Sequence, residues 1–326
     1  MKKLFGLLLF VAVVGIGCTK SSLIEQDAEA TPPLAGNFTH RGCASQEVLQ
    51  QQLKDDPTLA ARMEAIEEFT GRYQQNPSAF RLLINGMIEI PVVVNVVYNN
   101  ALENISLTQI QSQIDVLNAD YSGSNKDINK IPKYFIGVKA GDVNVRFVLD
   151  TVIRVLTKKT SFSTNDGVKK GAGGGIAPTS PLTKLNMWTC NLGNGILGYA
   201  QFPGGNPATD GIVILYDAFG LTNLIPYDKG RTATHEVGHW LNLRHIWGDA
   251  NCGNDFVADT PLHTGPNFGC PSEGTRSTCV GTPIMMTMNY MDYSDDPCLY
   301  MFSAGQKTRM NATFVVGGPR NTFAQP

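Results

Sequence analysis

Hydrophobic positions along the chain predict a helical segment followed by a longer region in which strands and helices alternate. From Gln46 to about Tyr73, apolar residues recur every three or four positions, which predicts a helix. From Ile90 to Tyr98 nearly every residue is β-branched or aromatic, as expected of a strand that is buried on both faces. Ser106 can cap the helix that follows and continues to Leu117.

Further along, short apolar runs predict strands at Val143–Leu149, Val152–Leu156, Leu185–Cys190, Gly198–Phe202 and Gly211–Tyr216. A Gly-rich surface loop is expected at 167–175, and a helix that contains His235 follows the last strand. After Gly248, regular structure becomes sparse because Gly, Pro, Asp and Cys dominate. We therefore predict an α/β (α+β) fold with a twisted mixed sheet in the N-terminal half and an irregular C-terminal half held by disulfides.

The N-terminus is typical of an export signal. Lys2 and Lys3 precede an apolar run at 4–17, which is too short for a transmembrane helix. The run ends at Gly15-Ile16-Gly17-Cys18, which resembles the lipobox of bacterial lipoproteins, so Cys18 is a candidate for lipidation. An ordinary secretory signal that discards Cys18 is the alternative. In either case we expect an exported protein, lipid-anchored in the cell envelope or secreted, in an environment where disulfides persist.

Three of the five histidines lie in one eleven-residue window. His235 and His239 are four residues apart, so on a helix both side chains can reach one metal ion. Glu236 projects beside them, where it can take a proton from a metal-activated water. A lone HExxH match is a weak signal because a buried helix can carry structural histidines, but three His and a Glu in one window favour a zinc site.

His245 can join the other two histidines only if the helix ends and the chain turns sharply. Asn242 stands where this turn is needed, and Asn adopts the left-handed conformation more readily than other non-glycine residues. The alternative third ligand in HExxH enzymes is a downstream Glu, here Glu273 in a loop rich in Gly and Cys. His245 is therefore favoured. Three neutral imidazoles leave a fourth zinc position open, which is typical of a catalytic site.

With its third histidine, the motif resembles HExxHxxGxxH of the metzincin clan of zinc endopeptidases, with Asn242 in place of the usual Gly. Metzincins also have a Met-turn below the metal, and Met291 in Asn289–Tyr293 fits it, although Met285, Met286 and Met288 crowd the same region. Further motifs make the sequence similar to the compact bacterial and archaeal branch of the pappalysin family over roughly Cys43 to Phe323. These motifs are Leu185–Trp188, Leu197–Pro203, Ser294–Cys298 and Phe302–Gln306.

The resemblance implies a metzincin-type catalytic domain and a zinc endopeptidase that is made as a latent zymogen. It makes Tyr293 a catalytic residue that helps to stabilise the tetrahedral intermediate, where a packing role is the alternative. It also implies an edge strand that pairs with extended substrates, formed by Gly198, Tyr199, Ala200 and Gln201.

We accordingly expect three parts along the chain: a signal peptide at 1–18, a linker and prosegment at 19–85, and the catalytic domain at 86–326. Residues 21–38 are polar and contain Pro, as expected of a tether. The net charge of −2 and the 17% of charged residues provide no basic surface for nucleic acid. We expect protein or peptide substrates, a monomer, and membrane contact only through a lipid anchor.

Four of the seven cysteines lie in the irregular half, and four cysteines allow three pairings. The resemblance implies Cys252–Cys279 and Cys270–Cys298.

Cys43 lies ahead of the catalytic domain and is a candidate cysteine switch, in which its thiolate fills the open zinc position. Adjacent Arg41 would help to keep that thiolate ionised. The alternative is a disulfide with Cys190, which lies in a strand-like run and is more simply a buried thiol.

Acidic residues also cluster after the zinc motif, at Asp249, Asp255 and Asp259. Calcium binds carboxylate and backbone oxygens in such loops. The resemblance implies a Ca²⁺ site formed by Asp255 with the carbonyl groups of Val257 and Thr260, and a solvated acidic loop is the alternative.

Substrate preference is indicated by Asp295 and Asp296, which follow the Met-turn and would place negative charge in the pocket beyond the scissile bond. We expect a preference for Arg or Lys directly after the cut, as in related family members, and self-processing ahead of Arg72 or Arg81. Two other functions stay open: a zinc-dependent cell-wall peptide amidase, and a zinc-stabilised exported lipoprotein that binds a partner without turnover. Glu236 argues against the second, because a purely structural site needs no base.

Overall fold

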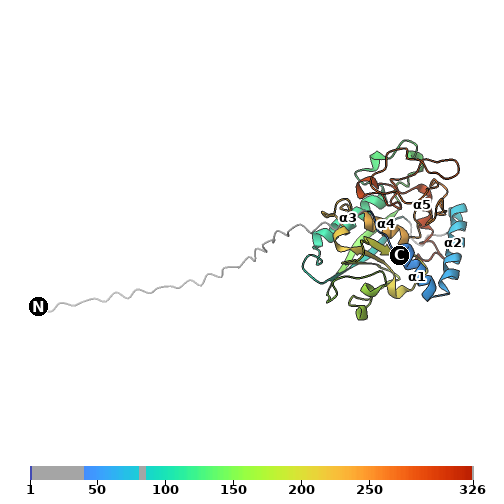
Figure 1. Cartoon of the computed structure of the whole chain (residues 1–326). Helices are drawn as coiled ribbons and strands as arrows, with labels where there is room; N and C mark the ends of the chain where they lie inside the picture. The colour runs from blue at the N-terminus through green and yellow to red at the C-terminus, as the bar shows by residue number, and fades with distance from the viewer. Residues whose placement is uncertain (2–39, 81–85, 325–326) are drawn as a thin grey trace. The chain divides into compact units, whose positions relative to one another are not determined.

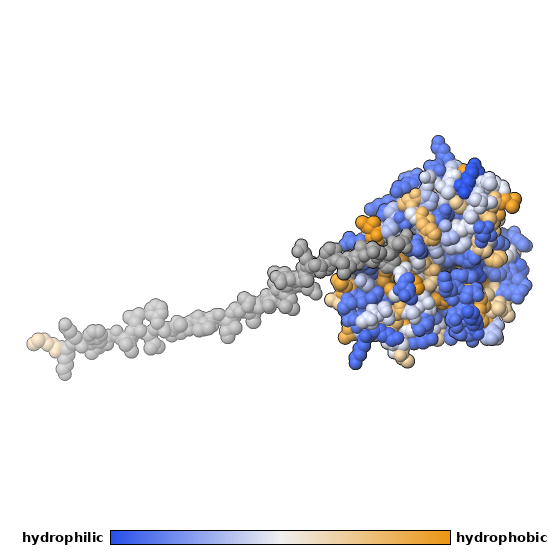
Figure 2. All heavy atoms as spheres, in the orientation of Figure 1, coloured by the Kyte–Doolittle hydropathy of each residue, from blue (hydrophilic) through white to orange (hydrophobic). Residues whose placement is uncertain are grey.

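The computed structural model describes residues 1, 40–80 and 86–324. The signal peptide, Cys18, the tether at 21–38 and Arg81 lie outside the described residues, so the statements about them remain predictions. Within the described ranges, no helix is both long and apolar enough to cross a membrane. On the face drawn in Figure 2, apolar side chains form small separate groups among hydrophilic ones.

A five-stranded mixed sheet occupies the centre, in the order β2-β1-β3-β5-β4. Neighbouring strands pair in parallel, except that β4 runs antiparallel to β5 at one edge. The strands are β1 (Ile88–Tyr98), β2 (Val145–Leu156), β3 (Leu185–Cys190), β4 (Gly198–Ala200) and β5 (Ile212–Leu215). This arrangement confirms the predicted mixed α/β fold, and the burial of β1 agrees with its β-branched sequence.

Strand β2 differs from the prediction, which divided it into two strands at 143–149 and 152–156. The structure has one continuous strand that pairs with β1 along its whole length. Val92 pairs with Leu149 and Val93 with Thr151, so Asp150 is an extra residue in the outer strand. A β-bulge of this kind lets a strand absorb one residue without ending.

Three α-helices lie in the described residues of the main body. α3 (Leu107–Ser122) begins at Ser106, whose side chain accepts a hydrogen bond from the amide of Gln109 as predicted. α4 (Arg231–Trp240) is buried over its whole length and carries the first two histidines of the motif. α5 (Ala304–Asn311) was not predicted, although Ser303 and Gln306 form a capping box at its start.

The N-terminal segment (residues 40–80) contains two helices where one was predicted. α1 (Ser45–Asp55) and α2 (Leu59–Gln75) are separated at Pro57, because proline lacks an amide hydrogen and its ring obstructs the preceding helical turn. The two helices are drawn in blue in Figure 1, where α2 lies close to α5. The carboxylate of Glu67 on α2 accepts a hydrogen bond of 2.5 Å from Arg309 on α5, which fixes this arrangement.

Beyond α4 the chain is largely irregular and is held by two disulfides, Cys252–Cys279 and Cys270–Cys298. These are the two pairs that the family resemblance implied. Cys43 and Cys190 are buried free thiols, so the alternative disulfide between them does not form.

Candidate metal centre

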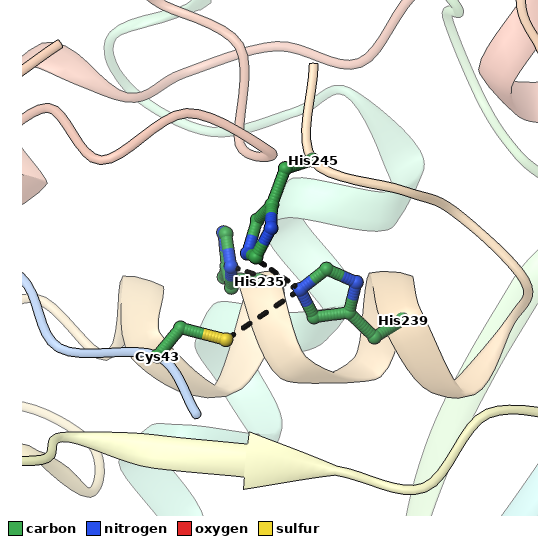
Figure 3. Close-up of side chains that lie close together, drawn as sticks. All are labelled: Cys43, His235, His239 and His245. Carbon is green, nitrogen blue, oxygen red and sulfur yellow. Dashed lines mark hydrogen bonds between the residues drawn. The ribbon is translucent and has the colours of Figure 1, made fainter. Parts of the chain in front are cut away.

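Three imidazoles meet at one point beside α4 (Figure 3). His235 and His239 lie one turn apart on the helix, as their spacing predicted. Asn242 then adopts a left-handed conformation, with a φ of 72°, and redirects the chain so that His245 turns back toward them. The Nε2 atom of His239 is 3.1 Å from the Nε2 atoms of both His235 and His245.

The opposite nitrogen of each imidazole is held by a second group. Because each Nδ1 has a partner, each Nε2 is left to act as a metal ligand, and the ring orientations are fixed. Backbone carbonyls bind two of the rings, at 2.7 and 2.8 Å, while a carboxylate binds the third. The pairs are His235 with Tyr290, His239 with Leu243, and His245 with Asp249.

The donor set fits a zinc ion. The Sγ atom of Cys43 lies 3.6 Å from Nε2 of His239, and the four candidate ligand atoms all lie within 4.8 Å of one another. Three imidazole nitrogens and one thiolate are ligands that tetrahedral zinc accepts. Burial and the neighbouring imidazoles lower the pKa values of His235 and His239 well below their ordinary range, so both rings are neutral and able to bind a cation.

Glu236 lies beside these ligands and is covered by the N-terminal segment. Its carboxylate accepts hydrogen bonds from Ser45 Oγ at 2.7 Å and from Cys43 Sγ at 3.5 Å. Burial raises the pKa of Glu236 to about 7. A carboxylate with a pKa near neutrality is suited to proton transfer at physiological pH.

Arg41 does not serve Cys43 in the way that the sequence predicted. Its buried guanidinium pairs with Asp296 at 2.5 Å and also donates to Thr232, and it lies over the ring of Tyr227. Burial and the negative charge of Glu236 instead raise the pKa of the Cys43 thiol.

Of the two acidic residues predicted to set specificity, Asp296 is fully buried beside Arg41. Its second carboxylate oxygen accepts the amides of Lys229 and Arg231. Asp295 is only partly buried, and its own amide binds the carbonyl of Gly269.

The edge strand is covered by the chain itself. Cys43 pairs in parallel with Gly198 of β4, through hydrogen bonds of 2.8 Å from the Leu197 amide to the Gly42 carbonyl and 3.0 Å from the Ala44 amide to the Gly198 carbonyl. A Cβ atom on Gly42 would come 2.6 Å from the carbonyl oxygen of Gly195. The close approach of the two backbone segments therefore requires glycine at this position.

The predicted edge-strand residues lie in or next to β4. The strand ends at Ala200, two residues before the predicted end at Phe202 and one before the last predicted substrate-pairing residue, Gln201. The side chain of Tyr199 is buried under Lys169, whose Nζ lies 4.9 Å from the ring centroid. The next side chain, Gln201, accepts a hydrogen bond from Thr209.

The predicted Met-turn lies directly against α4. Met291 is buried, and a Cβ atom on Gly238 of α4 would come 2.5 Å from its Sδ atom. The ring of Tyr293 lies 5.0 Å from that of His245, and its hydroxyl donates to the Cys43 carbonyl at 3.1 Å. Both residues therefore lie at the histidine cluster.

The residues proposed for calcium also lie together. The hydroxyl oxygen of Thr260 lies 2.7 Å from the carboxylate of Asp255 and 2.8 Å from the carbonyl of Val257, and its single proton is available to either acceptor. Burial raises the pKa of Asp255 to about 6. The other acidic residues of this loop have different partners, since Asp249 binds His245 and Asp259 binds the start of α5.

Comparison with known proteins agrees with this geometry. The family model described as "Pregnancy-associated plasma protein-A" matches residues 184–315. An extracellular metalloprotease of Colletotrichum graminicola is 31% identical over 90% of this chain and 95% of its own length. A Tannerella forsythia promirolysin mutant aligns with a TM-score of 0.79 and 41% identity over 87% of this chain and 97% of its own. Mature mirolysin with a cleaved peptide aligns with a TM-score of 0.71 and 45% identity over 74% of this chain and 97% of its own.

Proposed function

Because the chain belongs to the pappalysin family of metzincin metalloendopeptidases, we propose that it is a zinc-dependent endopeptidase made as a latent zymogen. The observation that carries this proposal is the convergence of three imidazoles and the Glu236 carboxylate directly beneath Cys43. The curated relatives are named extracellular metalloproteases, which supports export. Lipidation at Cys18 stays a prediction.

In the active form, His235, His239 and His245 would hold the zinc ion. When bound, zinc polarises the scissile carbonyl and lowers the pKa of a coordinated water. Glu236 takes the proton of the attacking water and passes it to the leaving amine. Tyr293 loses its acceptor when Cys43 leaves, so its hydroxyl becomes free to donate to the carbonyl oxygen that develops negative charge.

Latency rests on three groups of the N-terminal segment. Cys43 would supply the fourth zinc ligand, and Ser45 occupies the carboxylate of Glu236. Arg41 pairs with Asp296 and would thereby occupy the place of the substrate side chain directly after the scissile bond. The promirolysin structure also covers a larger share of this chain than mature mirolysin does, which supports a prosegment.

The same pocket supports a preference for Arg or Lys directly after the scissile bond. Oδ1 of Asp296 and the hydroxyl of Thr232 each accept a hydrogen bond from the Arg41 guanidinium, so the same two acceptors suit the planar fork of a substrate arginine. A substrate would carry this residue after the scissile bond, whereas Arg41 precedes Cys43. The N-terminal segment would therefore run opposite to a substrate, so we expect it to resist cleavage at the metal.

Calcium is the second proposed ion, held by Asp255 and by the carbonyls of Val257 and Thr260. The hydrogen bonds that the Thr260 hydroxyl and the Val257 amide make with the Asp255 carboxylate hold the three residues together, which supports this ligand set. Titration of the protein with Ca²⁺ should raise its melting temperature, and Asp255→Asn should abolish this rise.

The decisive experiment compares full-length variants on a denatured protein substrate. Cys43→Ala should cut it without prior processing, whereas Cys190→Ala, which removes the other buried free thiol, should stay latent like the parent. Adding Glu236→Ala to Cys43→Ala should abolish cutting while zinc stays bound. An active-site-intact, zinc-loaded Cys43→Ala protein that cuts no polypeptide would refute the peptidase proposal, and release of cell-wall peptides instead would point to an amidase.

A further inference from the structure

The contacts that hold the N-terminal segment come from a stretch that ends before the proposed processing point. Polar contacts to the rest of the chain extend from Arg41 to Gln74, which is the last of the described residues of this segment to make one. Residues 75–79 are exposed. Cleavage ahead of Arg81 therefore removes none of these contacts, and cleavage ahead of Arg72 removes only that of Gln74.

These contacts are distributed over both helices. In the first half, Arg41 binds Asp296, and Ser45 binds Glu236. In the second half, Arg62 donates to the carbonyl of Gly204 at 2.8 Å. Glu67 accepts a hydrogen bond of 2.5 Å from Arg309, and Thr70 accepts one of 3.5 Å from Asn242.

A small apolar core joins the two halves to the body. Leu49 of α1 and Leu59 and Met63 of α2 bury Phe202, in a cluster separate from the main core. On the body side, the guanidinium of Arg244 lies 4.5 Å from the centroid of the Phe202 ring. On the body, Phe202, Arg244, Arg309 and Asp296 thus form one surface. This surface binds both the apolar and the charged side chains of the N-terminal segment.

We infer that this surface binds the cut N-terminal segment as a separate chain, so that processing near Arg81 yields an inhibited two-chain complex. The inference rests on the proposed zymogen. Cutting the linker changes only the effective concentration of the segment, since a short link holds the tethered form at roughly millimolar levels. Activity then appears when the segment dissociates or is cut again.

A cut at the exposed junction between α1 and α2 can be compared directly with a cut in the linker. Pro57 and Thr58 are exposed there, and a cut at this point separates Arg41, Cys43 and Ser45 from the contacts of α2. The half that blocks the metal would then lose the anchor at Glu67. A cut at the junction should therefore activate the enzyme, whereas a cut in the linker should not.

Two full-length proteins test this inference. Both carry the recognition sequence of the same unrelated site-specific protease: the linker protein has it within residues 81–85, and the junction protein has it at Pro57. After complete cutting, the linker-cut protein should elute as one complex and keep peptidase activity at the level of the uncut parent at micromolar concentration. Activity should rise at least tenfold on dilution, with a concentration dependence that marks dissociation. Full activity immediately after the linker cut, unaffected by dilution, would overturn the inference.

Side-chain variants in the linker-cut protein provide a second measurement. Glu67→Ala removes the partner of Arg309 and should speed the appearance of activity about tenfold, as expected for a hydrogen bond between charged groups. Glu68→Ala changes the neighbouring exposed carboxylate and should have no effect. Equal rates for both would contradict the inference. If the junction-cut and fully diluted proteins cut no peptide at all, the proposed function fails instead.

Discussion

Asp249→Asn should weaken zinc binding through His245. His245 differs from the other two imidazoles, because its Nδ1 atom is paired with a carboxylate rather than a backbone carbonyl. Such a carboxylate makes the imidazole a stronger ligand, and losing partners of this kind typically costs about 10–100-fold in metal affinity. A hydrogen bond to a charged group contributes roughly 1.5–3 kcal/mol, which corresponds to the same range.

Asp249→Asn removes the negative charge of the side chain while keeping its size and shape. Asp249 has a φ of 56°, in the left-handed region, and Asn adopts this conformation as readily as Asp, so the backbone is not strained. Asn also keeps an oxygen that can accept the Nδ1 hydrogen, so the loss should lie near the tenfold end of the range. Asp217→Asn is the control, because this residue is half-buried in a short turn of residues 216–218.

Zinc affinity is measured by competition with a chromophoric chelator, with both variants in the Cys43→Ala background so that the thiol does not contribute. We expect about a tenfold higher dissociation constant for Asp249→Asn and an unchanged value for Asp217→Asn. A dissociation constant within twofold of the parent for Asp249→Asn would show that the carboxylate does not tune the ligand.

Three further predictions concern stability, measured by urea unfolding of the full chain. Asn242→Ala should be about 1–2 kcal/mol less stable than Asn242→Gly, because only the alanine is strained in the left-handed conformation; equal values would show that this strain is absent. Gly238→Ala should cost about 1–3 kcal/mol by crowding the Met291 sulfur, and this cost should vanish in a Met291→Ala background. Burial lowers the pKa of His263 to about 4 from its ordinary 6.5, so its neutral form contributes stability above pH 6.5 that is lost as the pH falls to 4. His263→Gln should remove about 3 kcal/mol of this acid sensitivity, and an unchanged pH profile would contradict the assignment.

Features set by local spacing could be predicted from the sequence. His235 and His239 share a face because helical residues four apart always do. The turn at Asn242 follows from the need to return His245 to the same point, and the structure has the left-handed backbone that this requires. The buried strand β1 likewise follows from its run of β-branched residues.

Local signals were also present for two differences. Pro57 interrupts the helical pattern of the N-terminal segment, and Ser303 with Gln306 has the spacing of a capping box. Helix α5 interrupts the irregular structure that the Gly, Pro, Asp and Cys content after Gly248 predicted. The bulge at Asp150 carries no comparable signal, because it depends on the register with β1.

Long-range partners could not be predicted, because no local rule joins them. Arg41 and Asp296 are 255 positions apart, and adjacency in sequence wrongly assigned Arg41 to the Cys43 thiolate. Ser45 was missed as a partner of Glu236 for the same reason, since the two meet only when the N-terminal segment lies along β4.

The burial of Cys43 and Cys190 helps to preserve the correct disulfide pairing. Thiol–disulfide exchange requires a thiolate that can approach a disulfide sulfur, so an exported chain with both unpaired and paired cysteines risks reshuffling. Cys43 and Cys190 are only 8% and 0% exposed. Burial also raises the pKa of Cys190, which keeps its thiol protonated. Among the described residues, the folded precursor therefore keeps its two bridges intact beside these two buried thiols, because neither thiol can readily approach a disulfide sulfur.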